Sequence, residues 1–228
     1  METKETAFIR TEQLIGKDAF LKLKNKKVII FGVGGVGSYA CEAIARCGVE
    51  DITIVDSDKV SVSNINRQII ALNSTVGKAK TSVMKERIKD INPNLKVTEY
   101  PIFFDESTKD YIDFSLYDYV LDCIDSVNSK VLLIKCAKEQ NVPIISSMGT
   151  GNKLDPSLLE IADIKNTSYC PLARAVRTRL KKENIYSLTV VYSKEQPIKS
   201  EGVPKSCAFV PSSAGLLMAS HVIRELIK

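Results

Sequence analysis

The chain has 228 residues, of which 44% are hydrophobic and 26% are charged, and its formal net charge is +5. This length and hydrophobic content suit one large domain that buries its own core. No apolar run is long enough to span a membrane and no apolar signal segment opens the chain, which argues against a membrane helix and predicts a cytoplasmic protein.

The first half alternates predicted strands with predicted helices. Strands are predicted over residues 27–32, 51–56, 95–100, 117–123 and 143–148, and helices over 36–47, 78–91, 105–114 and 126–140. Gly48 and Asn92-Pro93 end two of these helices. The polar residues between 59 and 68 predict a loop with a short helical turn.

The second half follows a different pattern. Residues 158–164 and 188–192 predict strands, with a basic helix over 171–182 between them, and the polar residues 194–207 predict a mobile loop. Pro211 is expected to open the last helix, where Gly215 indicates a close backbone contact. The chain therefore predicts an α/β fold with a Rossmann-like, doubly wound, mainly parallel sheet and an antiparallel C-terminal extension. We expect a single domain over residues 1–228, with a nucleotide-binding half (1–150) and a substrate-binding half (151–228).

The segment VIIFGVGGVGSYACEAIARCGVEDITIVDSD predicts a nucleotide site. Gly32 permits a sharp turn after the strand, Gly34 and Gly35 leave room for a phosphate, and Gly37 lets the helix pack close to the strand. The helix N-terminus then faces the phosphate. Asp56 lies 19 residues beyond Gly37, the spacing of a carboxylate that binds a ribose hydroxyl.

Polar and cationic residues that follow the second strand distinguish two kinds of nucleotide. Asn64, Arg67 and Lys80 are expected in the same crevice, because the carboxyl ends of parallel strands share one edge of the sheet. A triphosphate that is to be cleaved gains from such cations, whereas a dinucleotide is held largely by backbone amides. The alternative for Arg67 and Lys80 is ordinary surface charge.

Two carboxylates, Asp122 and Asp125, end the fourth predicted strand beside the same crevice. A carboxylate at this place suits Mg²⁺ bound against phosphates, and we assign that role to Asp125. The alternative is that Asp125 caps the helix that follows, and the two roles are compatible.

The motifs GVGGVG, DSD, SNINRQ, VGKAK and DCIDS, in this order, resemble the ubiquitin-activating-type adenylating enzymes, whose bacterial members include the ThiF and MoeB proteins. The resemblance implies ATP and Mg²⁺ as cofactors and gives roles to eleven residues. The glycine turn, Asp56 and Asp58 would bind the nucleotide, Asn64, Arg67 and Lys80 the phosphates, and Asp125 the metal. Arg10 would reach into a partner subunit, which implies a homodimer; its alternative is a charge on a loose tail. Arg10, Arg67, Lys80 and Asp125 are thus the candidate catalytic residues.

The blocks MGTGNKLDP, IADIKNTSYCPLARAVRTRLKK, LTVVYSKEQP and FVPSSAGLLMAS resemble the tRNA threonylcarbamoyladenosine dehydratases, also called TcdA or CsdL. This narrower resemblance covers residues 8–226. It implies ATP-dependent cyclisation of threonylcarbamoyladenosine in tRNA through a carboxyl-adenylate. Positioning and charge stabilisation would supply most of the catalysis, without a histidine base.

A tRNA substrate implies a surface that binds phosphates. Residues 164–182 contain no acidic side chain, and Arg174, Arg177 and Lys181 are spaced to share one helical face. Ala173 and Val176, with Leu180, form the apolar face that would dock on the body. The candidate RNA contacts are Tyr169, which would stack on a base, and Arg174, Arg177, Arg179, Lys181 and Lys182. The alternative is a solvated basic helix.

The six cysteines contain no CxxC pair, which disfavours a zinc ribbon. Four lie in apolar segments and are expected in the core: Cys41, Cys47, Cys123 and Cys136. Cys170 and Cys207 are expected nearer the surface, and we assign neither a catalytic role. His221, the only histidine, is expected to pack within the last helix.

Three other functions stay open. An activator of a ubiquitin-like sulfur-carrier protein would share the adenylation chemistry, although such enzymes often carry four zinc cysteines. An NAD-dependent oxidoreductase would explain the glycine turn and Asp56 but not Arg67 and Lys80. The third is a non-catalytic adaptor in a sulfur-transfer pathway. A sulfur-transfer partner protein is also compatible with the hypothesis of a tRNA-modifying dehydratase.

Overall fold

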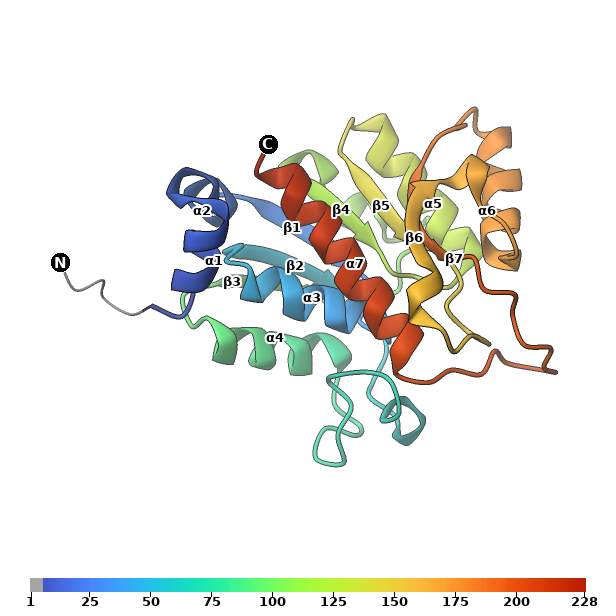
Figure 1. Ribbon diagram of the computed structural model, residues 1–228, viewed down its shortest axis with the longest axis horizontal. Coiled ribbons are helices and arrows are strands. Elements are labelled where there is room, and N and C mark those ends of the chain that lie inside the picture. Colours follow the sequence, from blue (N-terminus) through green and yellow to red (C-terminus); the bar gives the residue numbers. More distant parts are fainter. Residues whose placement is uncertain (1–5) are drawn as a thin grey trace.

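The computed structural model describes residues 6–228 as one seven-stranded sheet with helices on both faces (Figure 1). The strand order is β3-β2-β1-β4-β5-β7-β6, and all neighbours are parallel except β6 and β7. The strands are β1 Lys27–Phe31, β2 Asp51–Val55, β3 Lys96–Tyr100, β4 Tyr119–Asp122, β5 Ile144–Ser147, β6 Leu159–Asp163 and β7 Thr189–Ser193. The predicted fold class, including the antiparallel pair, is confirmed.

Seven α-helices accompany the sheet in the described residues: α1 Ile9–Ile15, α2 Lys17–Lys24, α3 Gly37–Arg46, α4 Lys80–Ile91, α5 Val127–Glu139, α6 Pro171–Lys182 and α7 Phe209–Leu226. Helix α6 has the predicted bounds. Residues 6–228 contain no helix that is both long and apolar enough to cross a membrane.

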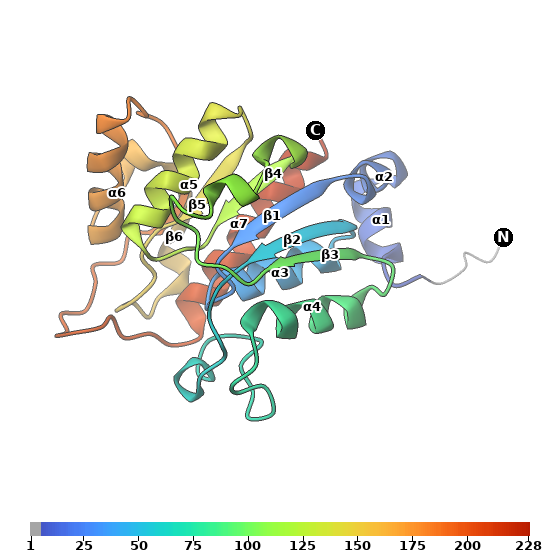
Figure 2. The same cartoon turned by 180° about the vertical axis from the view of Figure 1, so that it is seen from behind.

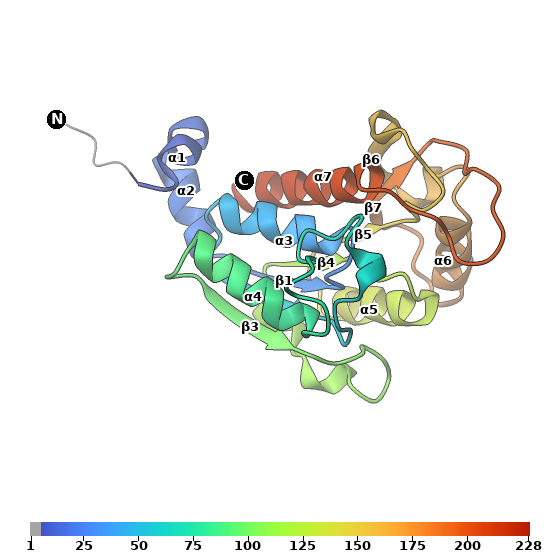
Figure 3. The same cartoon turned by 90° about the horizontal axis from the view of Figure 1, so that it is seen from below.

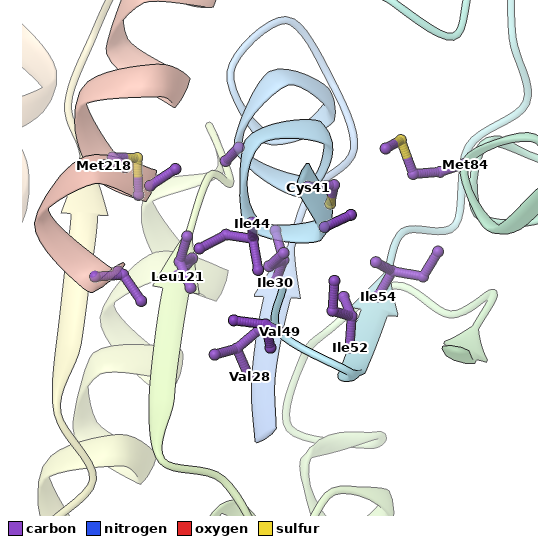
Figure 4. Packing of buried hydrophobic residues seen from close by; sticks show 14 of the residues in the cluster. Val28, Ile30, Cys41, Ile44, Val49, Ile52, Ile54, Met84, Leu121 and Met218 are labelled. Carbon is purple, nitrogen blue, oxygen red and sulfur yellow. The ribbon is translucent and has the colours of Figure 1, made fainter. Parts of the chain in front are cut away.

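The strands build two hydrophobic cores because successive side chains point to opposite faces. Val28 and Ile30 of β1 face the core under α3, α4 and α7, whereas Ile29 and Phe31 face the core under α5 and α6. Figure 4 shows the first core, in which Met218 of α7 lies on the same side of the strands as the side chains of α3 and α4. Figure 3 shows α3, α4 and α7 side by side over that face.

The centre of the sheet fixes the position of the site. Strand β1 pairs with β2 on one side and β4 on the other, so that Phe31 lies in register with Val55 and with Asp122. From β1 the chain continues to β2 and β3 on one side of the sheet, and then returns to β4 on the other side. At such a reversal of strand order a crevice opens beyond the carboxyl ends of β1, β2 and β4.

Two predictions about elements were wrong, and the first two helices were missed. Residues 105–114 do not form one helix but separate turns, with 3-10 turns at Lys109–Tyr111 and Phe114–Leu116. Helix α7 begins at Phe209 rather than at Pro211. No helix was predicted before β1, yet Arg10 lies on α1 rather than on a loose tail. Helices α1 and α2 stand together at the end of the sheet where β1 begins (Figure 2).

Candidate active site

The glycine turn after β1 has the predicted geometry. Gly32 adopts a φ of 85°, and a Cβ built on Gly37 would lie 1.7 Å from the carbonyl oxygen of Gly32. Only glycine therefore lets α3 start this close to the strand. At Gly35 the Cγ of Arg67 lies 3.5 Å from where a Cβ would stand, so the stem of Arg67 rests on the turn.

Asp56 is held at the end of β2 by two backbone amides. Its Oδ2 accepts a hydrogen bond of 2.6 Å from the Val33 amide, and its Oδ1 accepts one of 2.8 Å from the Asp58 amide. Burial raises the pKa of the Asp56 carboxyl, and the Lys80 ammonium and the two amides act in the opposite direction. The carboxylate thus links the glycine turn to the tip of β2, and its remaining lone pairs stay available for a ribose hydroxyl.

Lys80 opens α4 and is 5% exposed. Its ammonium lies 2.7 Å from Asp58 Oδ2, while the Asp58 side chain is 65% exposed. A buried ammonium with a partner that faces solvent is positioned to exchange that partner for an anionic ligand in the crevice. A β-bridge between Lys59 and Ala79 joins the two segments that carry this pair.

Asn64 is the last residue of the short 3-10 turn Val62–Asn64, and Arg67 follows three residues later. The buried Asn64 accepts a bond from the Ser61 amide through Oδ1, which leaves its amide N–H groups without a partner in residues 6–228. Arg67 donates to the Ser63 carbonyl and to Asn66 Oδ1, both at 2.9 Å, and forms no ion pair with any carboxylate that the structure describes. Both side chains therefore keep donors for a ligand.

Asp125 follows β4 and is exposed. Ser126, not Asp125, occupies the N-cap position of the helix that begins there, so the alternative role of Asp125 as the N-cap is wrong. The Asp125 carboxylate makes no hydrogen bond or ion pair with the described part of the chain. It is the one acid of the DCID motif that is free, because Asp122 is buried in a pair with Lys130 at 2.8 Å.

One cleft of about 640 Å³ brings most of the predicted nucleotide residues together. Its walls include Gly32, Gly34, Gly35, Asp56, Asp58, Asn64, Arg67, Lys80 and Asp125. Gly37 lies beneath the cleft, where it sets the packing. Arg10 and the basic residues of α6 do not line it.

Residues that sequence reasoning missed also line the cleft or support it. Gln68 is 6% exposed, and its Oε1 is buried without a hydrogen-bond partner in residues 6–228, which points to a ligand. Lys130 is fully buried and donates to Asp122 and to the Ser147 carbonyl. The SNINRQ motif contains Gln68 and gave a signal for it, whereas nothing in the sequence links Lys130 to Asp122.

The polar segment before α7 borders the cleft with Val203, Pro204 and Ser206. The Ser206 carbonyl accepts a 2.8 Å bond from Asn66, and Asn152 makes further bonds with the segment at Lys205 and Ile198. These contacts define the path of the segment, and its mobility stays a prediction.

The basic residues of α6 do not form one free face. Arg177 donates to the Ile164 carbonyl at 3.0 Å and to Thr167 Oγ1 at 2.8 Å, so the prediction that it lies on an open RNA-binding face is corrected. Arg174, Arg179, Lys181 and Lys182 are exposed, and Tyr169 is 63% exposed. The apolar face of Ala173, Val176 and Leu180 is buried as expected.

The cysteines are free thiols. Cys170 is 7% exposed and accepts a bond from the Ala173 amide, so its predicted place near the surface is wrong. Burial raises the pKa of the Cys123 and Cys41 thiols, which makes neither a nucleophile at neutral pH.

The ThiF family model matches residues 9–228 of the chain. The chain is 44% identical to the tRNA threonylcarbamoyladenosine dehydratase of Bacillus subtilis strain 168, a match that covers 97% of this chain and 94% of that protein. Among solved structures it resembles E. coli TcdA in complex with AMP, with a TM-score of 0.92, 33% identity, and coverage of 97% and 94%. The complex of E. coli TcdA with ATP gives a TM-score of 0.90 at 33% identity, with coverage of 97% and 93%. The chain therefore belongs to the ThiF family and, within it, to the tRNA threonylcarbamoyladenosine dehydratases.

Proposed function

We propose that the protein closes the ring of threonylcarbamoyladenosine in tRNA at the expense of ATP. The carboxylate of the modified nucleoside attacks the α-phosphate of ATP, and pyrophosphate leaves. The carbamoyl group of the same nucleoside then attacks the activated carbonyl, and AMP leaves with closure of a five-membered ring. The sum is the loss of one water from the nucleoside. The observation that carries the proposal is the single cleft in which a glycine turn, Asp56 and several phosphate-binding donors face one another.

The residues of the cleft have different roles in binding ATP. The glycine turn and Asp56 hold the nucleoside part of ATP. Asn64, Arg67 and Lys80 donate hydrogen bonds to the phosphates and stabilise the charge that builds on the departing pyrophosphate. Lys80 would exchange Asp58 for a phosphate oxygen as ATP binds, because both anions compete for one ammonium.

Asp125 is the residue that would hold Mg²⁺. No group of three or more His, Cys, Asp or Glu side chains in residues 6–228 is arranged to bind a metal alone. A single free carboxylate beside a phosphate site nevertheless fits Mg²⁺, which takes its other ligands from phosphates and water. When bound, the ion would neutralise charge on the phosphates.

The assembly is part of the same proposal. We infer a homodimer in which Arg10 of one subunit completes the site of the other, since Arg10 is exposed on α1 and does not line its own cleft. We place the enzyme in the cytoplasm with its tRNA substrate. A sulfur-transfer protein is a compatible further partner.

The experiment measures AMP and pyrophosphate release from ATP with tRNA that carries threonylcarbamoyladenosine, and the mass of the product nucleoside. We expect both products only with the modified tRNA, together with a nucleoside that has lost one water. AMP that appears equally without tRNA, or only with a small carrier protein, would contradict the proposal.

A matched pair of variants links the activity to the cleft. Lys80→Ala is expected to lower turnover by roughly 10²–10³-fold, because it removes a donor to the leaving group. Lys78→Ala removes the same charge from an exposed position that does not line the cleft, and is expected to keep turnover within about twofold of the parent protein.

A further inference from the structure

A second cavity of about 960 Å³ adjoins the nucleotide cleft. It lies between α5, α6 and the loop after β3, and Figure 2 shows these elements on the same side of the sheet. We call it the α5–α6 groove. Phe103 and Ser129 line both the groove and the nucleotide cleft, so the two spaces meet at these residues. A ligand that reacts in the cleft therefore has a path into the groove.

Ser129 lies at the junction of the two spaces. Its side chain belongs to the first turn of α5, and the residue is 3% exposed. Its hydroxyl lines both spaces and makes no hydrogen bond within the described residues. The hydroxyl is therefore free to bond a ligand that passes from one space to the other.

The acidic side chains of the groove are engaged. Glu183 pairs with Lys135 at 3.0 Å, and Glu106 pairs with Lys109 at 2.8 Å. Asp105 accepts bonds from the backbone amide and hydroxyl of Ser107. Glu183 and Glu106 are therefore neutralised by their lysines, whereas Asp105 keeps its negative charge because its donors are neutral.

Two cations of the groove have no such partner. Arg179 and Lys182 lie on α6 and form no ion pair with any carboxylate in residues 6–228. Arg179 donates to Asn128 Oδ1 on the opposite wall, which directs its guanidinium across the groove. A guanidinium has five N–H donors, so most remain for another acceptor. These two unpaired cations outweigh the one unpaired carboxylate of Asp105, so the free charge of the groove is positive.

We propose that the α5–α6 groove binds the RNA strand that adjoins the target nucleoside, with its phosphates on Arg179 and Lys182. The inference rests on the proposed function, since a nucleoside that reacts in the cleft is joined by phosphodiesters to its neighbours in the chain. Phe103, which is 53% exposed at the junction, offers a ring on which a base can stack. An extended strand rather than a duplex is expected, because stacking on Phe103 needs an unpaired base.

Two basic residues away from both spaces supply a matched control. Lys138 on α5 and Arg224 on α7 are exposed and line neither the groove nor the nucleotide cleft. The double variants Arg179→Ala/Lys182→Ala and Arg224→Ala/Lys138→Ala each remove one arginine and one lysine, so their net charge is identical. Only the first changes the groove.

The experiment measures the Kd for tRNA that carries threonylcarbamoyladenosine as a function of salt, together with the KM for ATP. The groove variant is expected to bind tRNA at least tenfold more weakly at low salt. Loss of two contacts to a single strand should also reduce the slope of log affinity against log salt by about 1.4. The control variant is expected to stay within about threefold of the parent protein, and the KM for ATP should be unchanged in both.

Two outcomes would overturn the inference in different ways. If the parent protein converts modified tRNA but both double variants weaken its binding equally, tRNA contact is diffuse and the groove has no special role. If the parent protein releases no AMP with modified tRNA, the proposed function itself fails. Circular dichroism of both variants checks that the substitutions leave the fold intact.

Discussion

The pair of Asp122 and Lys130 is the most buried charge in the described chain, with both side chains fully inaccessible. Asp122 also accepts a bond from the Ile124 amide, and Lys130 donates to the Ser147 carbonyl. The pair therefore ties the ends of β4 and β5 to α5 beside Asp125. Neither residue lines the nucleotide cleft, so we expect the pair to position the DCID loop rather than to contact a ligand.

Lys130→Met should lower the free energy of unfolding by about 3–5 kcal/mol, because it leaves a buried carboxylate without its partner. Urea unfolding measures the loss. In the double variant Asp122→Leu/Lys130→Met no charge is left uncompensated, so a substantial part of the stability should return. A loss below about 1 kcal/mol in the single variant would show that the site relaxes or admits water.

His221 gives a second residue-level prediction. The ring of His221, on α7, makes a T-shaped contact with the Tyr119 ring, and its partial burial lowers the pKa of the imidazole below 6.5. Between the folded pKa and 6.5 the unfolded chain then binds more protons than the folded chain, so the stability that neutral His221 contributes is lost as the pH falls through this window.

The chain has one histidine, so its ring protons give one titration curve by NMR. We expect a midpoint below the ordinary value. The variant His221→Gln should show a shallower decline of stability between about pH 7 and pH 5. A midpoint at or above 6.5 would contradict the assignment, and would mean that nearby Glu225 outweighs burial.

At the scale of elements, the contact of α3 with α7 depends on one glycine. A Cβ built on Gly215 would lie 2.2 Å from the Val36 carbonyl oxygen and 3.0 Å from the Ala40 nitrogen. Both atoms belong to the backbone of the glycine turn and of α3, so neither can move aside as a flexible side chain would. The close approach expected from the sequence is confirmed.

Gly215→Ala should therefore lower the free energy of unfolding by about 1–3 kcal/mol, since α7 must move away from α3. It should also weaken ATP binding, because α3 carries the phosphate-binding turn. The neighbouring Leu216→Ala is the control: Leu216 is 49% exposed, and its truncation should change stability by no more than about 0.5 kcal/mol. Thermal unfolding and ATP titration of both variants test the difference.

The elements also show where sequence patterns succeed and fail. The strand, turn, helix and strand around Gly32 were predictable because their signals are local. Residues 105–114 were misread because Asp105 and Asp113 bind the amides two residues further on, which favours turns over a helix. Helices α1 and α2 were missed because they are short, and neither has a side-chain N-cap bond.

At the scale of the whole molecule, the cleft joins segments from Phe31 to Pro211. Sequence motifs predicted the residues that face it, because each motif follows a strand and parallel strands end at one edge. They did not predict how residues pair across the sheet. Tertiary packing decides that Lys130 pairs with Asp122, that Arg177 bonds to Ile164 and Thr167, and that the Ser129 hydroxyl has no partner. Such packing leaves no periodic signal in the sequence.

The proposed dimer makes the last prediction at this scale. Helix α1, which carries Arg10, lies at the end of the sheet where β1 begins (Figures 1 and 3). The cleft lies at the opposite end, beyond the carboxyl ends of the strands. An Arg10 that acts in catalysis would then serve the cleft of a second copy. Arg10→Ala and Lys80→Ala are each expected to inactivate the enzyme when present in both subunits.

Random assembly of the two variants in equal amounts distinguishes the geometries. If Arg10 acts across a two-fold interface, half of the dimers are mixed and each has one site with both native residues, so about a quarter of the parent activity should return. If Arg10 acts within its own subunit, mixed dimers contain no intact site and activity stays at background. AMP release is measured first on the whole mixture, with the equally tagged parent protein as the reference. Each variant carries a different tag, so that mixed dimers can also be purified and measured alone. Purification of mixed dimers alone should raise the recovery to about half, since every dimer then holds one working site.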